Sequence, residues 1–279
     1  MDWLEAAARA RADGRSAVLV TVSAVRGHSP REAGAKMVVT AEGSYDSIGG
    51  GNLEATVTDR AHELLAAGTQ TPETITMSLN DRVTTRHGRQ CCGGEVTVLL
   101  EPLPARPTVA VFGVGHVGME LGRILARHPL IVHLADSRAE QLEEARQLTG
   151  QIADVRVHHA PAPETVLATL PAGAHVYVMT HDHAEDMVLC DAALRRGDLD
   201  VGLIGSRAKW ARFRKQLTEG GHAPAAVDTI TSPIGLPTLA GKSPAVIAVS
   251  VAADLLARLE AEADPGGPTH VPELHDTVG

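Results

Sequence analysis

The sequence predicts an α/β protein in which a smaller N-terminal α+β domain precedes a Rossmann-type doubly wound parallel sheet. Three observations lead to this class. A glycine fingerprint follows a short apolar strand within residues 108–136, strands and helices then alternate up to residue 219, and a proline-rich segment precedes both. We therefore expect a first domain at 1–101, a stiff linker at 102–107, a Rossmann-like domain at 108–260 and a disordered tail at 261–279.

The composition narrows the class of protein. A net charge of −9 over 279 residues argues against nucleic acid or an anionic membrane as a partner. No apolar run approaches the roughly 20 residues that cross a bilayer, and the N-terminus lacks the pattern of a secretory signal. The 3 cysteines are odd in number and two of them are adjacent, which is typical of free thiols in a reducing compartment. We expect a cytoplasmic protein.

In the first domain, capping residues and turns define the elements. Asp2 can cap a helix that ends at Ala12. The β-branched apolar run 16–25 predicts a buried strand, and a turn-rich loop separates it from a strand at 36–40. A hairpin turn at 42–43, a helix that ends near residue 68, and strands at 73–79 and 95–101 complete the domain. The linker then begins, because prolines are excluded from helix interiors and central strands.

In the second domain, apolar runs alternate with amphipathic segments, as in a parallel sheet with helices on both faces. The predicted strands are 108–112, 130–135, 155–158, 174–179 and 199–204. The predicted helices are 117–127, 138–148, 163–170, 184–195 and 206–219. A last helix is capped at Ser243 and has Pro244 at its first position.

The fingerprint reads Gly113-Val114-Gly115-His116-Val117-Gly118, between a strand and a helix. In this order the glycines permit a tight turn, a close approach of backbone to a pyrophosphate, and close packing of helix on strand. The helix N-terminus offers free N–H groups to the anion. Asp136 ends the next strand, where an acid can accept hydrogen bonds from ribose hydroxyls. Gly113, Gly115, His116, Gly118 and Asp136 therefore form the first candidate site.

A second glycine motif, Gly49-Gly50-Gly51, precedes a helix in the first domain. Successive glycines let several backbone N–H groups converge on a phosphate. The same residues also suit a tight strand-to-helix turn with Asn52 as the cap. The sequence leaves both interpretations open.

The most reactive thiol is expected in Cys92-Gly93-Gly94, since basic residues precede it and two glycines expose it. A thiolate there can bind a soft transition metal or carry a persulfide sulfur. The alternative is a pair of small residues at a hairpin turn. Cys190 falls on an apolar helix face and is expected in the core.

Two further segments follow strands whose carboxyl ends line the ligand crevice of such sheets. His181 and Asp182 come directly after one strand, and Ser206 and Arg207 come after the next. We expect Asp182 or Asp186 to cap the first helix, Ser206 to cap the second, and Arg207 to contact an anion. Solvated surface residues are the alternative.

Several motifs, taken together, resemble the XdhC/CoxI family of xanthine dehydrogenase accessory proteins. They are SPREAGAKMVV (29–39), SIGGGNLE (47–54), QCCGGEVTVLLE (90–101), VFGVGHVG (111–118), THDHAED (180–186), VGLIGSR (201–207), SPIGL (232–236) and SPAVIAVSVAADL (243–255). The resemblance covers the chain up to about residue 260. The loop after SPIGL departs from the family pattern.

The resemblance implies a non-catalytic carrier of the molybdenum cofactor, as molybdopterin or its cytosine dinucleotide form. It implies that a cysteine desulfurase sulfurates the cofactor and that a xanthine-dehydrogenase-type enzyme receives it, with a homodimer as a further expectation. Cys92 then binds molybdenum, and Gly93, Gly94 and the glycines of both motifs bind the cofactor. We hypothesise that the cofactor lies in a cleft between the domains, with its phosphate toward Gly113 and its molybdenum toward Cys92.

Two rival functions remain. The fingerprint and Asp136 also suit an NAD(P)-dependent oxidoreductase, for which Arg138 could contact a 2′-phosphate. The sequence lacks a Ser-x-x-x-Tyr-x-x-x-Lys run, which weakens this rival without excluding it. The other rival is an interaction module whose glycines only shape the fold.

Overall fold

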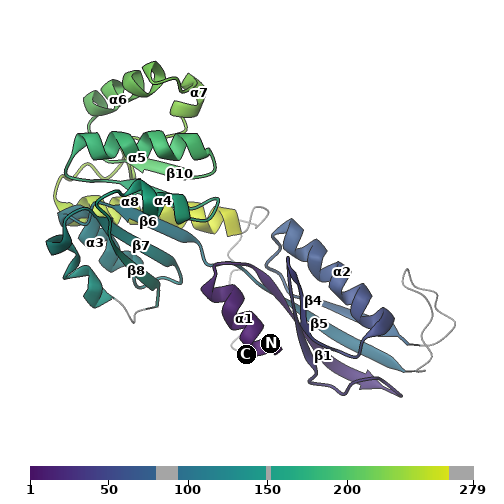
Figure 1. Ribbon diagram of the computed structural model, residues 1–279. Coiled ribbons are helices and arrows are strands. Elements are labelled where there is room, and N and C mark those ends of the chain that lie inside the picture. Colours follow the sequence, from purple (N-terminus) through teal and green to yellow (C-terminus); the bar gives the residue numbers. More distant parts are fainter. Residues whose placement is uncertain (80–93, 149–151, 264–279) are drawn as a thin grey trace, which may run out of the picture.

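The computed structural model describes residues 1–79, 94–148 and 152–263. Within them the chain forms two sheets of five strands each. The two sheets lie side by side in Figure 1, joined by residues 104–107, which are neither helix nor strand. Both expected domains are therefore present: an antiparallel N-terminal sheet and a parallel C-terminal one.

The N-terminal sheet has the order β3-β2-β1-β5-β4, and its strands pair antiparallel. Its strands are β1 (Ala17–Arg26), β2 (Lys36–Thr40), β3 (Gly43–Asp46), β4 (Glu73–Ser78) and β5 (Glu95–Leu103). Two helices, α1 (Trp3–Ala12) and α2 (Gly51–Ala67), cover opposite faces. Alternation along β2 shows why: Met37 and Val39 pack in the core beneath α2, whereas Val38 packs with Ala6 and Ala10 of α1.

The C-terminal sheet is parallel throughout, in the order β10-β9-β6-β7-β8. Its strands are β6 (Thr108–Phe112), β7 (Ile131–Asp136), β8 (Asp154–His159), β9 (His175–Val178) and β10 (Asp200–Leu203). The helices are α3 (His116–Leu125), α4 (Glu164–Thr169), α5 (His183–Arg196), α6 (Arg207–Glu219), α7 (Pro224–Val227) and α8 (Pro244–Ala263). From β6 the chain adds β7 and β8 on one side of the sheet. It then crosses back and adds β9 and β10 on the other side of β6.

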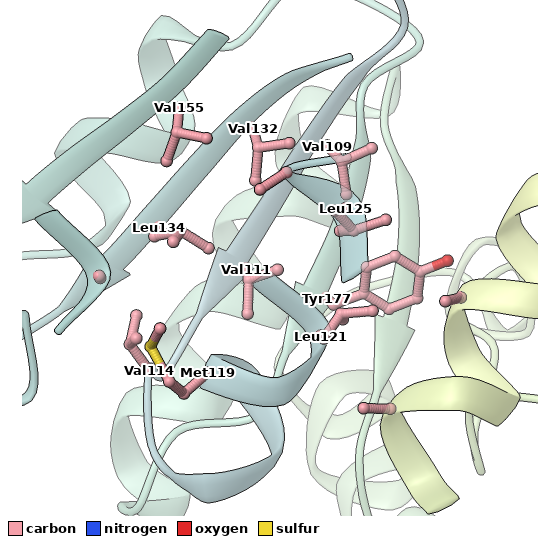
Figure 2. Packing of buried hydrophobic residues seen from close by; sticks show 14 of the residues in the cluster. Val109, Val111, Val114, Met119, Leu121, Leu125, Val132, Leu134, Val155 and Tyr177 are labelled. Atoms are coloured by element: carbon pink, nitrogen blue, oxygen red, sulfur yellow. The ribbon is translucent and has the colours of Figure 1, made fainter. Parts of the chain in front are cut away.

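Both faces of this sheet are buried, which explains the continuous apolar runs of its strands. Val109 and Val111 of β6 face the core that α3 and α8 cover, as Figure 2 shows. Ala110 and Phe112 face the opposite core, which is covered by helices α4 to α7. Cys190 is fully buried in that second core, as expected, and burial raises the pKa of its thiol to about 12.

Three expectations about the elements were wrong in part. The segment 138–148 is not an α-helix but two 3₁₀ turns, Ala139–Leu142 and Ala145–Leu148. Leu142 ends the first turn and Ala145 begins the second, and both side chains are fully buried in the core on the α3 side of the sheet. Pro102 and Leu103 belong to β5; β4 pairs only as far as Leu100, so the missing N–H of Pro102 disrupts no ladder with β4.

The third difference concerns the expected tail. Residues 261–263 continue α8, which ends at Ala263, and residues 264–279 lie outside the described part of the chain. No helix among the described residues combines the length and apolarity needed to cross a bilayer.

The amino ends of the parallel strands face the N-terminal domain. Arg156, near the start of β8, donates from Nη2 to the carbonyl oxygen of Ala12 at 2.9 Å. A Cβ added at Gly14 would meet Ile131 Cδ1, at the start of β7, at 3.0 Å. The backbone N–H of Ala105 donates to Ser16 Oγ at 3.0 Å. The carboxyl ends of the strands therefore point away from the N-terminal domain, as Figure 1 also shows.

Candidate functional site

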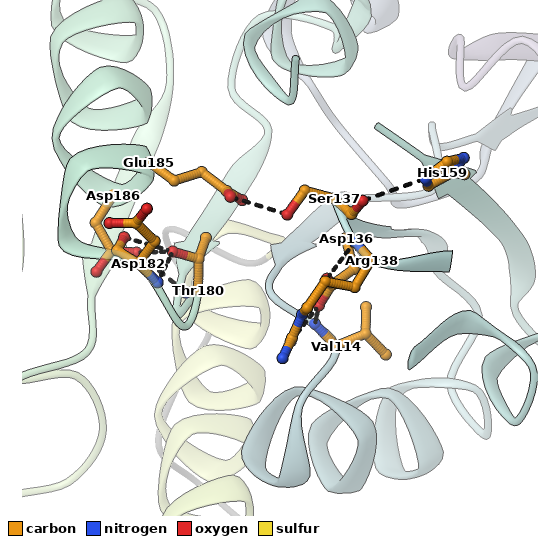
Figure 3. A network of polar contacts seen from close by, with 9 residues as sticks. All are labelled: Val114, Asp136, Ser137, Arg138, His159, Thr180, Asp182, Glu185 and Asp186. Carbon is orange, nitrogen blue, oxygen red and sulfur yellow. Dashed lines mark hydrogen bonds and ion pairs between the residues drawn. The ribbon is translucent and has the colours of Figure 1, made fainter. Parts of the chain in front are cut away.

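The carboxyl edge of the parallel sheet has its switch point at β6, because β7 and β9 flank this strand on opposite sides. A ligand crevice is expected at such a point. The segments that follow the three strands meet there: the loop 113–118 after β6, the loop 136–138 at the end of β7, and the loop 180–182 after β9 (Figure 3). Predicted site residues from three separated stretches of sequence are thus brought together.

Packing within the protein requires two of the fingerprint glycines. Gly113 has φ +101°, and a Cβ there would lie 2.3 Å from the carbonyl oxygen of Met179. A Cβ at Gly118 would lie 2.0 Å from the carbonyl oxygen of Gly113. Neither contact can be relieved by a side-chain movement, because both partners are backbone.

Gly115 is different. A Cβ at this position would meet nothing within 4 Å, and its φ of −76° is open to any residue. Gly115 is also the N-cap residue of α3, and no side chain caps this helix. The N–H groups of the first turn therefore have no side-chain acceptor in the described chain, and His116 beside them is exposed. This is the arrangement of a helix N-terminus that can receive an anion.

Asp136 is buried, with a side chain that is 1% exposed, and all of its acceptor positions are used. Oδ1 accepts the backbone N–H of Arg138 at 2.9 Å and its Nε at 3.0 Å. Oδ2 accepts the backbone N–H of Val114 at 2.8 Å and Arg138 Nη2 at 3.0 Å. Burial acts to raise the pKa of Asp136, but these hydrogen bonds outweigh it and hold the pKa below the ordinary value.

The segment after β9 is organised by two aspartates. Asp182 caps α5, as expected, and its Oδ1 accepts the N–H of Ala184 at 2.7 Å. Asp186 is fully buried and accepts the N–H and the hydroxyl of Thr180, at 3.0 and 2.8 Å. His181 is exposed. No group of three histidine, cysteine or acidic side chains suited to a metal occurs within residues 1–79, 94–148 and 152–263.

The segment after β10 is tied to the same place. Ser206 caps α6, as expected, and accepts the N–H of Lys209 at 3.2 Å. Lys209 Nζ donates to the buried Asp186 at 2.6 Å and to the carbonyl oxygen of Ile204 at 2.9 Å. Arg207 is exposed at the first position of α6. The buried pair of Lys209 and Asp186 therefore fixes α6 against the loop that follows β9.

Sequence reasoning missed a contact across the crevice. Ser137 donates from Oγ to Glu185 at 3.0 Å, which joins the end of β7 to the first turn of α5 over the edge of β6 (Figure 3). Burial raises the pKa of Glu185. The pairing of Lys209 with Asp186 and the clamp of Arg138 on Asp136 were missed as well. Only proximity in the chain, Arg138 two residues after Asp136, could have indicated one of these contacts.

In the N-terminal domain, the three glycines begin α2 with φ values of +129°, +71° and +60°. Their N–H groups already have acceptors: Gly49 donates to Ser47 Oγ at 3.1 Å, and Gly50 donates to Glu54 Oε2 at 3.1 Å. A carboxylate of the chain itself thus occupies the start of this helix. Whether Gly51 and its neighbours also receive a phosphate stays a prediction.

The reactive-thiol segment is only partly described. Cys92 and Gly93 lie outside the described residues, as does Cys91. Gly94 precedes β5, and a Cβ there would lie 2.1 Å from the carbonyl oxygen of His28. Gly94 is therefore required by the packing of the loop 26–31 on β5.

The structure does not bring the two glycine motifs together in one chain. β1 pairs with β5 so that Ala17 and Leu103 lie at the linker end, whereas Arg26 and Glu95 lie at the far end. Gly94 is at that far end, and so is Gly49, whose Cβ would touch Pro30 at 2.8 Å. The loop 113–118 lies at the opposite extremity, beyond the carboxyl end of β6. The hypothesis of one interdomain cleft lined by both motifs is therefore wrong for the described residues.

Two models of known protein families match this chain. Residues 109–255 match the model of the XdhC Rossmann domain, and residues 10–77 match that of the XdhC and CoxI family. The chain belongs to the XdhC/CoxI family.

The individual proteins that resemble this chain share less than 30% of its sequence. The uncharacterized protein YqeB of Escherichia coli (strain K12) is 27% identical over 262 residues, which cover 91% of this chain and 46% of that protein. The chain thus spans about half the length of this relative. A crystal structure described as a xanthine dehydrogenase (BH1974) from Bacillus halodurans is 19% identical, covers 96% of this chain and 98% of its own, and has a TM-score of 0.47. An imine reductase from Pseudomonas sp. is 15% identical, covers 57% of this chain and 63% of its own, and has a TM-score of 0.23.

Proposed function

We propose that this chain binds the molybdenum cofactor, holds it while a cysteine desulfurase supplies the terminal sulfido ligand, and delivers it to a xanthine-dehydrogenase-type enzyme. The chain acts as a cytoplasmic carrier and not as a catalyst. Membership of the XdhC/CoxI family supports the accessory role. The chemistry of the crevice at β6 supports the choice of cargo.

The observation that carries the proposal is the space at Gly115. The cofactor is a pterin that bears a phosphate, and the uncapped N-terminus of α3 offers backbone N–H groups to such an anion. The protein's own packing gives no reason for a glycine at this position, since a Cβ would meet nothing within 4 Å. A close approach of a ligand phosphate gives that reason.

Cys92 is the proposed ligand of the molybdenum, because a thiolate is a soft donor suited to that metal. Its placement rests on the family resemblance, since the residue lies outside the described part of the chain. The proposed cofactor is molybdopterin or its cytosine dinucleotide form. A homodimer remains part of the proposal: Gly94, two residues after Cys92, lies at the end of the N-terminal sheet far from Gly115, so a cofactor anchored at Gly115 would meet the Cys92 thiol of a second chain.

The rival function, an oxidoreductase, fits the crevice less well when its cofactor is NAD. An NAD site needs an acid with free acceptors for the ribose hydroxyls. The acceptors of Asp136 are used by Arg138 and by Val114. NAD therefore serves as a comparison ligand in the experiments below.

Gly115→Val tests the proposed function. The valine side chain would fill the space above the α3 N-terminus, so molybdenum and pterin per chain should fall at least tenfold in protein purified from a molybdenum-replete host. The matched control is Ala225→Val, which adds a similar volume on an exposed residue of α7. Metal analysis and pterin fluorescence give the two readouts. Cofactor content equal to that of the control would remove the crevice from the proposal.

A further inference from the structure

The corner of the crevice beside the loop 113–118 carries a guanidinium where a dinucleotide site carries a free acid. An ionised carboxylate has about four lone-pair positions. Asp136 accepts four hydrogen bonds, two from Arg138 side-chain nitrogens and two from the backbone, all between 2.8 and 3.0 Å. A ribose diol can therefore bind Asp136 only after Arg138 has been displaced from a buried carboxylate.

Arg138 is itself held in a defined position. Its Nε and Nη2 bind different oxygens of Asp136, which is the two-point geometry that fixes a planar guanidinium. Its side chain is 29% exposed, and within the described part of the chain Nη1 has no hydrogen-bond partner. Figure 3 shows the guanidinium beside Val114, in the loop that leads to α3. The corner thus presents N–H donors and a positive charge next to the uncapped helix N-terminus.

The charges around Arg138 keep it protonated. Asp136 raises its pKa first, and the nearby Glu140 and Glu185 add to this effect. Glu185 also accepts the Ser137 hydroxyl at 3.0 Å. A guanidinium with free N–H donors is suited to phosphate oxygens, and it has no acceptor for the hydroxyl protons of a diol.

We infer that Arg138 makes this corner a subsite for a phosphomonoester, in place of the ribose diol of a dinucleotide. The inference rests on the crevice being the ligand site of the proposed function. It narrows the ligand class to molecules that place a phosphomonoester dianion at the corner. Two sources share this chemistry: the terminal phosphate of molybdopterin, and the 2′-phosphate of NADP. A ligand with an unmodified ribose at this place, such as NAD, is disfavoured.

Binding of four probes tests the inference: NAD, NADP, the oxidised fluorescent pterin of the cofactor with its phosphate, and the same pterin after phosphatase treatment. The probes form two pairs that differ by one phosphomonoester: NADP with NAD, and the phosphorylated pterin with the dephosphorylated one. In at least one pair, the wild-type chain should bind the member with the phosphomonoester at least tenfold more tightly. Arg138→Ala should abolish this preference and strengthen NAD binding, because Asp136 then regains free acceptors. Arg138→Lys should retain part of the preference.

The outcomes separate this inference from the proposed function. Discrimination between NADP and NAD without any pterin binding would support the Arg138 subsite and contradict the cofactor carrier. Equal binding of both members of each pair, or binding of none of the four probes, would overturn the inference. An Arg138→Lys chain that is folded by circular dichroism yet has lost all phosphate preference would overturn it as well. If the role of Arg138 were merely structural, its removal would not strengthen NAD binding relative to NADP binding.

Discussion

Gly115 and Gly118 stand three residues apart in one fingerprint, but different contacts explain them. At Gly118 the obstacle to a side chain is the carbonyl oxygen of Gly113, 2.0 Å from the position of a Cβ. At Gly115 no atom of the described chain lies within 4 Å of that position. Packing thus explains Gly118, whereas Gly115 has no packing reason and is assigned to the proposed ligand site. Stability measurements can separate the two.

Gly118→Ala should destabilise the protein by about 1–3 kcal/mol, because the helix must move away from the backbone of Gly113. Gly115→Ala should change the free energy of unfolding by less than about 0.5 kcal/mol, since the added methyl group meets only open space. Urea denaturation followed by circular dichroism measures both changes. Equal destabilisation by the two substitutions would show that Gly115 is also required by packing.

At the scale of the elements, strands β7 and β8 are joined by a stacked pair of histidines, the buried His133 and the half-buried His158. The rings of His133 and His158 stack with centroids 5.0 Å apart and planes 7° apart. The Nδ1 atom of His133 lies 3.1 Å from the Nε2 atom of His158. Burial, and then the positive charges of His158 and Arg156, lower the pKa of His133 to about 4. Burial also lowers the pKa of His158.

These pKa values predict a loss of stability in mild acid. Both groups bind protons more readily in the unfolded chain, where a histidine has a pKa near 6.5. The stabilisation is therefore complete above about pH 6.5 and is lost as the pH falls toward about 4. The lowered pKa of His133 alone corresponds to a loss of unfolding free energy on the order of 3 kcal/mol at low pH.

His133→Phe should flatten the dependence of unfolding free energy on pH between about 6.5 and 4. His28→Gln, at an exposed position, should leave it unchanged and is the control. Thermal unfolding at a series of pH values measures the effect. A His133→Phe chain with the acid sensitivity of the wild type would exclude the pair as its source.

At the scale of the whole molecule, the two glycine motifs lie at opposite extremities. β5 alone spans 9 residues from the far end of the N-terminal sheet to the linker side, which is about 30 Å, and β6 adds its own length beyond the linker. One small cofactor cannot contact Gly49 and Gly115 of the same chain at once. The phosphate anchor of the proposed function is therefore assigned to the crevice at β6 alone.

Cys92→Ser tests the proposal that the Cys92 thiolate binds the molybdenum of the cofactor. Molybdenum per chain should fall several-fold, because a serine hydroxyl does not replace a soft thiolate. The adjacent Cys91→Ser provides the matched control and should retain the metal. Metal analysis of the purified variants, with pterin fluorescence alongside, measures the outcome. Unchanged molybdenum in Cys92→Ser would remove this thiol from the proposed function.

The sequence by itself determined the fold class, the glycine fingerprint and the caps. These features depend on local chemistry: Asp2, Asp182 and Ser206 each bind an N–H group at the start of their own helix. Alternating apolar runs likewise follow from burial of one or both faces of a sheet. The ordered motifs then indicated the XdhC/CoxI family, which the family models confirm.

Only the tertiary structure decided which residues meet. Arg138 uses up the acceptors of Asp136, and Lys209 reaches Asp186 across 23 residues of sequence. The directions of β5 and β6 from the linker place the glycine motifs apart, and no local pattern encodes this arrangement. Such contacts depend on how whole elements pack, because side chains distant in sequence become neighbours only when strand order and helix position are set.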